Sequence, residues 1–77
     1  MAKPTRVSNQ IRRLRFEANE MTQADLAQRV GVTRQTIIAI EQGRYSPSLE
    51  MAFQIARALD VNLDDVFRYE PPEGGTP

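Results

Sequence analysis

The sequence contains no cysteine and no histidine among its 77 residues. Without these two residue types, the usual zinc ligands, thiolate nucleophiles and imidazole bases are missing, and no disulfide can stabilise the fold. No apolar run approaches the ~18 residues of a membrane-spanning helix, and residues 1–6 lack the apolar core of a signal peptide. We therefore expect a cytoplasmic protein that is not an enzyme, binds no cofactor, metal or evident small-molecule substrate, and does not enter a membrane.

The length and the charge of the chain limit its fold and its partners. One small domain of this size has a core that supplies only ~3–5 kcal/mol, so close packing or dimerisation should matter. The net charge of zero argues at first against a nucleic-acid partner. However, residues 1–44 carry eight basic and four acidic side chains, a net charge of +4, whereas residues 45–77 have a net charge of −4. This asymmetry predicts a basic face for phosphate, unless the two halves mix on the folded surface.

The segment TQADLAQRVGVTRQTIIAIEQG, residues 22–43, predicts two short helices joined by a turn. Thr22 can cap the first helix, with Asp25 placed three residues later as in a capping box. Gly31 can take the left-handed conformation that ends a helix, which predicts a first helix of eight residues. Thr33 can cap the second helix, which ends before another glycine. This pattern is typical of a helix-turn-helix.

The second of these helices has a distinctive outward face. At about 100° per residue, Ile37 and Ile40 point inward. Gln35 and Gln42 point in the opposite direction, flanked by Ile38 and Ala39, and Arg34 reaches round from the first turn. In the major groove, arginine pairs with guanine, glutamine with adenine, and an aliphatic side chain contacts the thymine methyl group. The face is therefore suited to double-stranded DNA, although Gln35 can also be a solvated surface residue and Ile38 a packing residue.

The spacing of these residues resembles that of a known family. With Gln23 as the first motif position, Ala27 is fifth, Gly31 ninth, Ile37 fifteenth and Ile40 eighteenth, which is similar to the Cro and phage-repressor family, also called the XRE family. The resemblance is greatest to its small single-domain bacterial regulators. It runs from about Val7 to Tyr69 and includes QTIIAIEQGRYSPSLEMAFQIARAL. Two departures are a loop before Thr22 that is one residue longer than is common, and apolar residues at Ile38 and Ala39.

The resemblance implies an all-α, five-helix lambda-repressor-like DNA-binding domain over residues 1–70. Residues 71–77 lack helical period and are rich in proline and glycine, which favours a flexible tail. The first helix is predicted from Ser8 to Ala18, with Ile11 and Leu14 buried and Phe16 covered by a terminus. In the family the two ends of the chain pair as an antiparallel ribbon. The segments that can do so here are residues 5–7 and 67–69.

The remaining helices complete the scaffold. Pro47 and Ser48 open a fourth helix, and Asn62 caps a short fifth helix. The apolar face of the fourth helix is predicted to consist of Leu49, Ala52, Ile55, Ala56 and Leu59. The side chains that follow Asn62 and close the core are predicted to be Leu63, Val66 and Phe67.

The family also implies roles for individual residues. The expected base-reading residues are Arg34, Gln35, Ile38 and Ala39. The expected phosphate-binding residues are Gln23, Thr33, Thr36, Arg44, Tyr45 and Ser46, although Thr33 is explained by capping and Tyr45 can equally cover the core. Arg15 and Glu41 resemble an ion pair that ties the first helix to the third. The expected dimer interface is Val61, Leu63, Phe67 and Tyr69, residues that can also belong to a monomer core.

These expectations predict a sequence-specific transcriptional regulator. A homodimer would bind an inverted-repeat operator with half-sites ~34 Å apart. A chain this short leaves no room for an effector domain, which favours a repressor that occupies a promoter. The alternative is a protein-interaction module of the same fold, such as an antitoxin or a coactivator-like adaptor. An enzyme would rest only on carboxylates such as Asp64 and Asp65, which helix-start electrostatics already explain.

Overall fold

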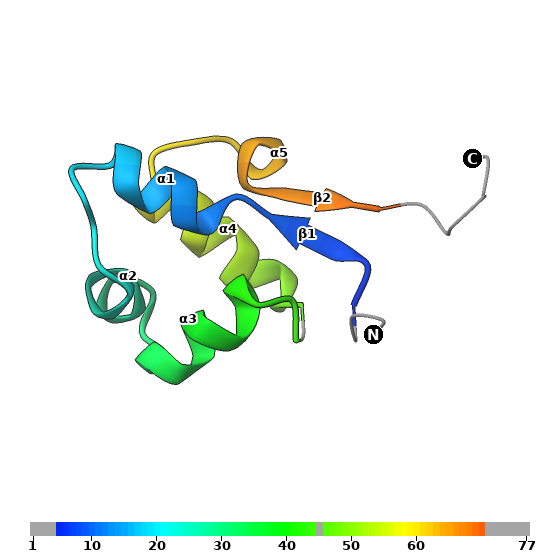
Figure 1. Cartoon of the computed structure of the whole chain (residues 1–77), viewed down its shortest axis with the longest axis horizontal. Helices are drawn as coiled ribbons and strands as arrows, with labels where there is room; N and C mark the ends of the chain where they lie inside the picture. The colour runs from blue at the N-terminus through cyan, green and yellow to red at the C-terminus, as the bar shows by residue number, and fades with distance from the viewer. Residues whose placement is uncertain (1–4, 45, 71–77) are drawn as a thin grey trace.

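The computed structural model describes residues 5–44 and 46–70. Figure 1 shows helices packed around a shared interior, with a two-stranded ribbon extending from them. In chain order the elements are β1 (Val7–Asn9), α1 (Ile11–Glu17), α2 (Gln23–Val30), α3 (Arg34–Glu41), α4 (Leu49–Ala58), α5 (Leu63–Val66) and β2 (Phe67–Tyr69). The described part of the chain thus has the predicted five helices and ribbon, and the predicted tail at residues 71–77 lies outside it.

The two helices of the motif begin and end where the sequence predicts. Thr22 Oγ1 accepts a hydrogen bond from the Asp25 N–H at 2.9 Å, and the Thr22 N–H donates to Asp25 Oδ2 at 3.2 Å. Gly31 ends α2 with a φ of 75°, so α2 has the predicted eight residues. Thr33 Oγ1 accepts from the Thr36 N–H at 3.2 Å and caps α3. These caps fix where the second helix of the motif begins.

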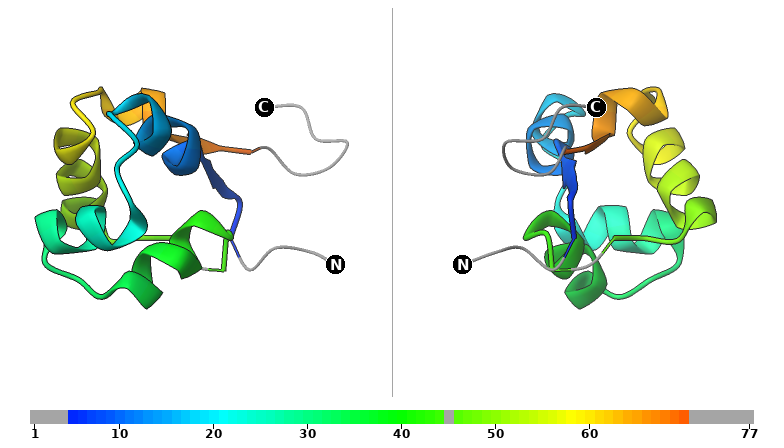
Figure 2. Two further views of the ribbon diagram at one scale, coloured as in Figure 1. Left: turned by 60° about the vertical axis from the view of Figure 1, so that its left-hand side comes forward. Right: turned by 90° about the vertical axis from the view of Figure 1, so that its right-hand side faces the viewer.

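Each helix contributes one or two branched aliphatic side chains to the core. The fully buried ones are Ile11, Leu26, Ile37, Ile40, Ile55 and Val66. Full burial of such a side chain contributes roughly 1.5–3 kcal/mol relative to exposure. Leu63 and Phe67 are half-buried and pack against this core, as predicted. Figure 2 shows the arrangement of the helices from two further sides.

The predicted start of the first helix near Ser8 is wrong. Residues Val7–Asn9 form β1, which pairs antiparallel with β2 so that Ser8 lies opposite Arg68 and Asn9 opposite Phe67. Asn9 Oδ1 also accepts the Ile11 N–H at 3.1 Å, a local bond that competes with helix for the backbone. β2 lies where it was predicted, and β1 lies two residues later than the predicted segment at residues 5–7.

Two apolar residues were placed wrongly by the sequence. Leu49 was predicted on the buried face of α4, but it is 68% exposed because it is the first residue of the helix, next to the solvent-facing cap Ser48. Phe16 was predicted to be covered by a terminus, but it is 69% exposed. Because Phe16 follows the buried Leu14 by two residues, or about 200° of helix rotation, it points away from the core.

Candidate nucleic-acid interface

The outward face of α3 is accessible in the folded chain. Arg34 and Gln35, in the first turn, are exposed. Ile38 and Ala39, one turn later, are half-buried and therefore still reach the surface. The opposite side of the same helix is anchored by the buried Ile37. One face of α3 is thus fixed to the core while its other face is free to contact a large partner.

An open cleft of about 1150 Å³ lies between α1, α2 and α3. Its walls bring together three residues predicted to contact DNA, from two helices: Gln23, Arg34 and Ile38. Gln35 and Ala39 do not line it. The charged lining residues are Arg12, Arg13, Arg15, Arg34, Glu20 and Glu41. Arginines outnumber glutamates, so the cleft has a net positive charge that attracts phosphate.

A hydrogen-bonded network joins the three helices at the bottom of this cleft. Arg15 Nε donates to Glu41 Oε2 at 2.7 Å, and a second Arg15 nitrogen donates to Glu41 Oε1 at 3.2 Å. Arg15 also donates to the Met21 carbonyl oxygen at 2.9 Å, which ties down the loop before α2. The Gln23 amide donates to Glu41 Oε1 at 3.2 Å. The network therefore orients Gln23 at the start of α2.

The other predicted phosphate contacts occupy the ends of α3. Thr33 and Thr36 lie at its beginning, where their hydroxyl oxygens are 3.1 Å apart and share a hydrogen bond. Arg44 and Ser46 are exposed just beyond its end, on the segment that leads to α4. Tyr45 lies outside the described residues.

Two features of the cleft were not found by sequence reasoning. Arg12 and Arg13 of α1 line it, although neither was singled out. The signal was the basic run IRRLR, in which Arg12 and Arg13 follow the buried Ile11 by about 100° and 200° of helix rotation and so point to the surface. The bond between Gln23 and Glu41 was also missed. It joins residues 18 positions apart, and no spacing rule predicts such a contact.

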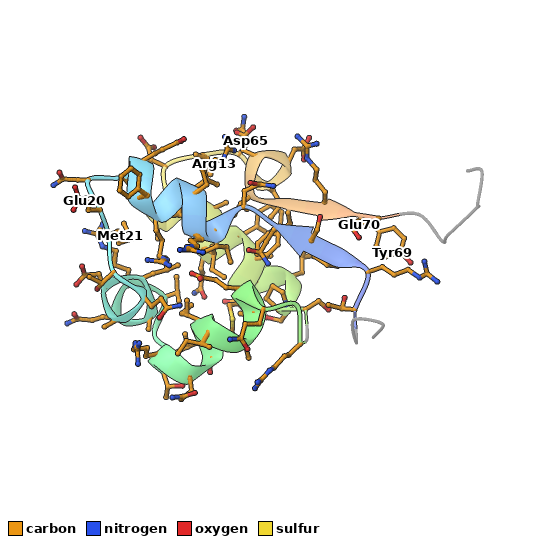
Figure 3. The ribbon with its side chains drawn as sticks, in the orientation of Figure 1. Arg13, Glu20, Met21, Asp65, Tyr69 and Glu70 are labelled. Carbon is orange, nitrogen blue, oxygen red and sulfur yellow. The ribbon has the colours of Figure 1, made fainter. Side chains whose placement is uncertain are left out.

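Acidic side chains near α5 lie apart from this cleft. A second, smaller depression of about 450 Å³ lies where α4 meets α5. It is lined by Asp60 and Asp65 with the single basic residue Arg57. Figure 3 shows Asp65 on α5, well apart from α3. The acidic side chains of α5 therefore do not neutralise the cleft that Arg34 lines.

The four predicted dimer-interface residues fall into two groups. Val61, Leu63 and Phe67 are half-buried and pack against the core of their own chain. Tyr69 is 72% exposed near the outer end of the ribbon (Figure 3). Tyr69 is therefore the one whose surface remains largely available to a second chain.

In residues 5–44 and 46–70, no group of three or more acidic side chains is placed to hold a metal ion. None of the helices in this part of the chain has the length and apolarity needed to span a bilayer.

The model of a helix-turn-helix protein family matches residues 11–66, which extends from the start of α1 to the end of α5. The chain belongs to the XRE-type helix-turn-helix family. It is 54% identical over 55 residues to HTH-type transcriptional regulator MJ0272 of Methanocaldococcus jannaschii, covering 71% of this chain and 83% of that protein. An HTH-type transcriptional regulator of Methanothermobacter thermautotrophicus is 65% identical over 48 residues, which cover 61% of this chain and 70% of that protein.

The helix-turn-helix fold also matches solved structures. The crystal structure of the restriction-modification controller protein C.AhdI from Aeromonas hydrophila superposes with a TM-score of 0.64 at 31% identity, covering 71% of this chain and 78% of that one. The lambda-repressor-like fold implied by the sequence resemblance is confirmed. The family and its relatives are regulators and not enzymes.

Proposed function

We propose that this protein is a transcriptional regulator that binds double-stranded DNA in a sequence-specific manner through α3. The observation that carries the proposal is the exposure of Arg34 and Gln35 at the beginning of a helix whose other face is buried. The family membership and the regulator names of the relatives support the DNA-binding class.

In the proposed complex α3 enters the major groove, which is wide enough for an α-helix. Arg34 pairs bidentately with the O6 and N7 atoms of a guanine, and Gln35 pairs with an adenine. Ile38 contacts a thymine methyl group, and Ala39 leaves room for the base edges to approach the helix. Because Arg34 and Gln35 are exposed, neither has to leave a packed position before it meets a base.

The phosphate backbone is held on both sides of this helix. Gln23 lies in the first turn of α2, where backbone N–H groups and the helix dipole favour an anion. Its amide already donates to Glu41, so the side chain is oriented before DNA arrives. At the other end, Arg44 supplies charge and Ser46 a hydroxyl group, with Tyr45 between them in the sequence. Thr33 and Thr36 add hydroxyl groups at the start of α3.

The protein acts as a homodimer on an inverted repeat, with one α3 in each of two half-sites ~34 Å apart. A single module reads too few base pairs to select one promoter, and a two-fold dimer doubles the length of sequence that is read. Val61, Leu63, Phe67 and Tyr69 form the dimer interface, with Tyr69 as its most exposed member. The bound dimer represses by occupying promoter DNA.

The test is the salt dependence of duplex binding. Fluorescence anisotropy with a labelled duplex, repeated over a series of salt concentrations, gives the slope of log Kobs against log[salt]. A protein that neutralises phosphates has a slope of about −0.9 per phosphate contacted. We expect a slope steeper than about −3, since several phosphate contacts are proposed. A flat slope, or no binding to any duplex in low salt, would overturn the proposal.

A further inference from the structure

In each strand of the ribbon, alternate residues turn their backbone N–H and C=O groups either toward the other strand or away from the ribbon. The Glu70 N–H donates to the Arg6 carbonyl oxygen at 2.8 Å, and the Gln10 N–H donates to the Val66 carbonyl oxygen at 2.9 Å. Antiparallel strands alternate hydrogen-bonded and non-hydrogen-bonded pairs. Residues 6, 8 and 10 therefore bond to residues 70, 68 and 66 inside the ribbon. It follows that the backbone groups of residues 7, 9, 67 and 69 point outward.

The outer side of β1 already makes contacts within the chain. The Val7 N–H donates to Thr5 Oγ1 at 3.1 Å. The Asn9 side chain donates to the Ile40 carbonyl oxygen at 2.9 Å, which connects β1 to the end of α3. A second strand added at β1 would have to replace the bond between Val7 and Thr5.

The edge of β2 is different. The Phe67 N–H donates to the Leu63 carbonyl oxygen and so belongs to the end of α5. Among residues 5–44 and 46–70, the N–H and the C=O of Tyr69 have no hydrogen-bond partner. Figure 1 shows β2 projecting beyond the helices, and Figure 3 places Tyr69 and Glu70 near its outer end. Such an edge is a ready template for another strand.

We propose that β2 strands of two copies pair antiparallel about a two-fold axis that sets Tyr69 opposite the second copy's Tyr69. Each Tyr69 N–H donates to the other Tyr69 C=O, and the two ribbons become one four-stranded sheet. This inference rests on the proposed homodimer and specifies its contact. The donor and the acceptor belong to the same residue, so a two-fold pairing satisfies both at once.

The charges of β2 select this register. With Tyr69 opposite itself, Arg68 lies opposite the second copy's Glu70, and symmetry repeats this pair of opposite charges. Arg68 and Glu70 are both exposed. In the register shifted by two residues, the next one in which outward-pointing backbone groups face each other, Arg68 lies opposite the second copy's Arg68. Opposite charges across an antiparallel pair stabilise it, and like charges destabilise it. Pairing also covers part of the Tyr69 ring, which is 72% exposed in the single chain.

Single-cysteine variants test the register, because the natural chain has no cysteine. Hydrogen-bonded antiparallel partners have Cα atoms ~5.5 Å apart, within the range that a disulfide spans. Under mild oxidation, Tyr69→Cys should form a covalent dimer at least about tenfold faster than Gln54→Cys, an exposed position on α4 that serves as the control. Faster cross-linking of Arg68→Cys would show the shifted register. Equal rates for all three variants would overturn strand pairing.

A second pair of variants tests the backbone bond itself. Tyr69→Pro removes an N–H that points out of the ribbon, so the bonds between β1 and β2 remain. Tyr69→Thr removes the ring and keeps the N–H. Only the proline variant loses the two hydrogen bonds between the copies. Its dimerisation, measured by sedimentation, should therefore be roughly tenfold weaker than the dimerisation of the threonine variant. Circular dichroism melts check that both remain folded.

Equal dimerisation of the proline and threonine variants would overturn the backbone pairing while leaving a homodimer through another surface. A natural chain that stays monomeric, alone and on DNA, would overturn both the pairing and the proposed homodimer. Neither result would alter the salt slope by which DNA binding is tested.

Discussion

The Arg15 guanidinium of α1 forms a two-point ion pair with the Glu41 carboxylate at the end of α3, at 2.7 and 3.2 Å. The two side chains are only 14% and 10% exposed. Removing one partner of such an enclosed pair leaves the other charge without compensation. Since Glu41 also holds Gln23, the pair connects the stability of the fold to the geometry of the proposed DNA-binding side.

We predict that Glu41→Ala lowers the free energy of unfolding by about 3 kcal/mol, measured by urea denaturation. Arg13→Ala is the matched control, because it breaks an exposed contact of 3.9 Å between Arg13 and Glu17 whose side chains are 58% and 56% exposed. That loss should stay below about 1 kcal/mol. Losses of equal size in the two variants would contradict the role given to the enclosed pair.

Asp25 should make the stability of α2 depend on pH. The hydrogen bond from the Thr22 backbone N–H, then that with the Thr22 side chain, hold the pKa of Asp25 below its ordinary value of 3.8. A carboxyl group whose pKa is lower in the folded state stabilises the fold above the unfolded pKa. This stabilisation is lost as the pH falls through the folded value, below 3.8.

The measurement compares thermal unfolding of the natural chain and Asp25→Asn from neutral pH down to below 3.8. The natural chain should lose more stability over this range, because the asparagine side chain does not titrate. Parallel curves for the two proteins would show that the capping carboxylate contributes nothing to the acid sensitivity.

Glycine should be required at position 31 because of the left-handed backbone conformation there, and not because a larger side chain would clash. Its φ is +75°, and a Cβ added there would meet no atom within 4 Å. Gly31→Ala should therefore cost about 1–2 kcal/mol through left-handed strain alone. Gly31→Asn should cost less, because asparagine tolerates this conformation better. Equal denaturant midpoints for Gly31→Ala and the natural chain would contradict this explanation of the turn.

Arg44 and Arg57 provide a test of where phosphate is bound. Both are exposed, but Arg44 follows α3, and Arg57 lies on α4 beside Asp60 and Asp65. Arg44→Ala should weaken binding to all duplexes alike and make the salt slope shallower by ~1. Arg57→Ala should leave the slope unchanged. If the Arg57 variant changed the slope as much as the Arg44 variant, the phosphate surface would have been placed on the wrong side.

The parts of the fold that sequence predicts best are those fixed by local chemistry. Thr22, Asp25 and Gly31 act within their own helix, and α2 has the predicted bounds. Asn9 and Leu49 were misplaced because their environment depends on partners or on a position at a helix end. The outward direction of Gln35 followed from helical periodicity, whereas the role expected of Arg34 also needed the family resemblance.

In the candidate site, too, local features could be predicted from the sequence and contacts between distant residues could not. Periodicity and the family resemblance locate Gln23 and Arg34, and the structure brings both to one cleft. The open edge of β2 at Tyr69 depends on which backbone groups the β1 pairing uses, and it follows from strand register rather than from residue type. Distant pairings of this kind appear only when the chain is folded.

We propose that the face of α3 bearing Arg34 and Gln35 reads bases in the major groove. Selection from a random duplex pool, carried out in parallel with the natural chain and Arg34→Ala, shows whether it does. We predict that the natural chain enriches an inverted repeat, and that Arg34→Ala enriches the same repeat with preference lost at one guanine in each half-site, a loss of ~1–3 kcal/mol there. An unchanged preference at every position, or no enrichment by the natural chain, would contradict the claim.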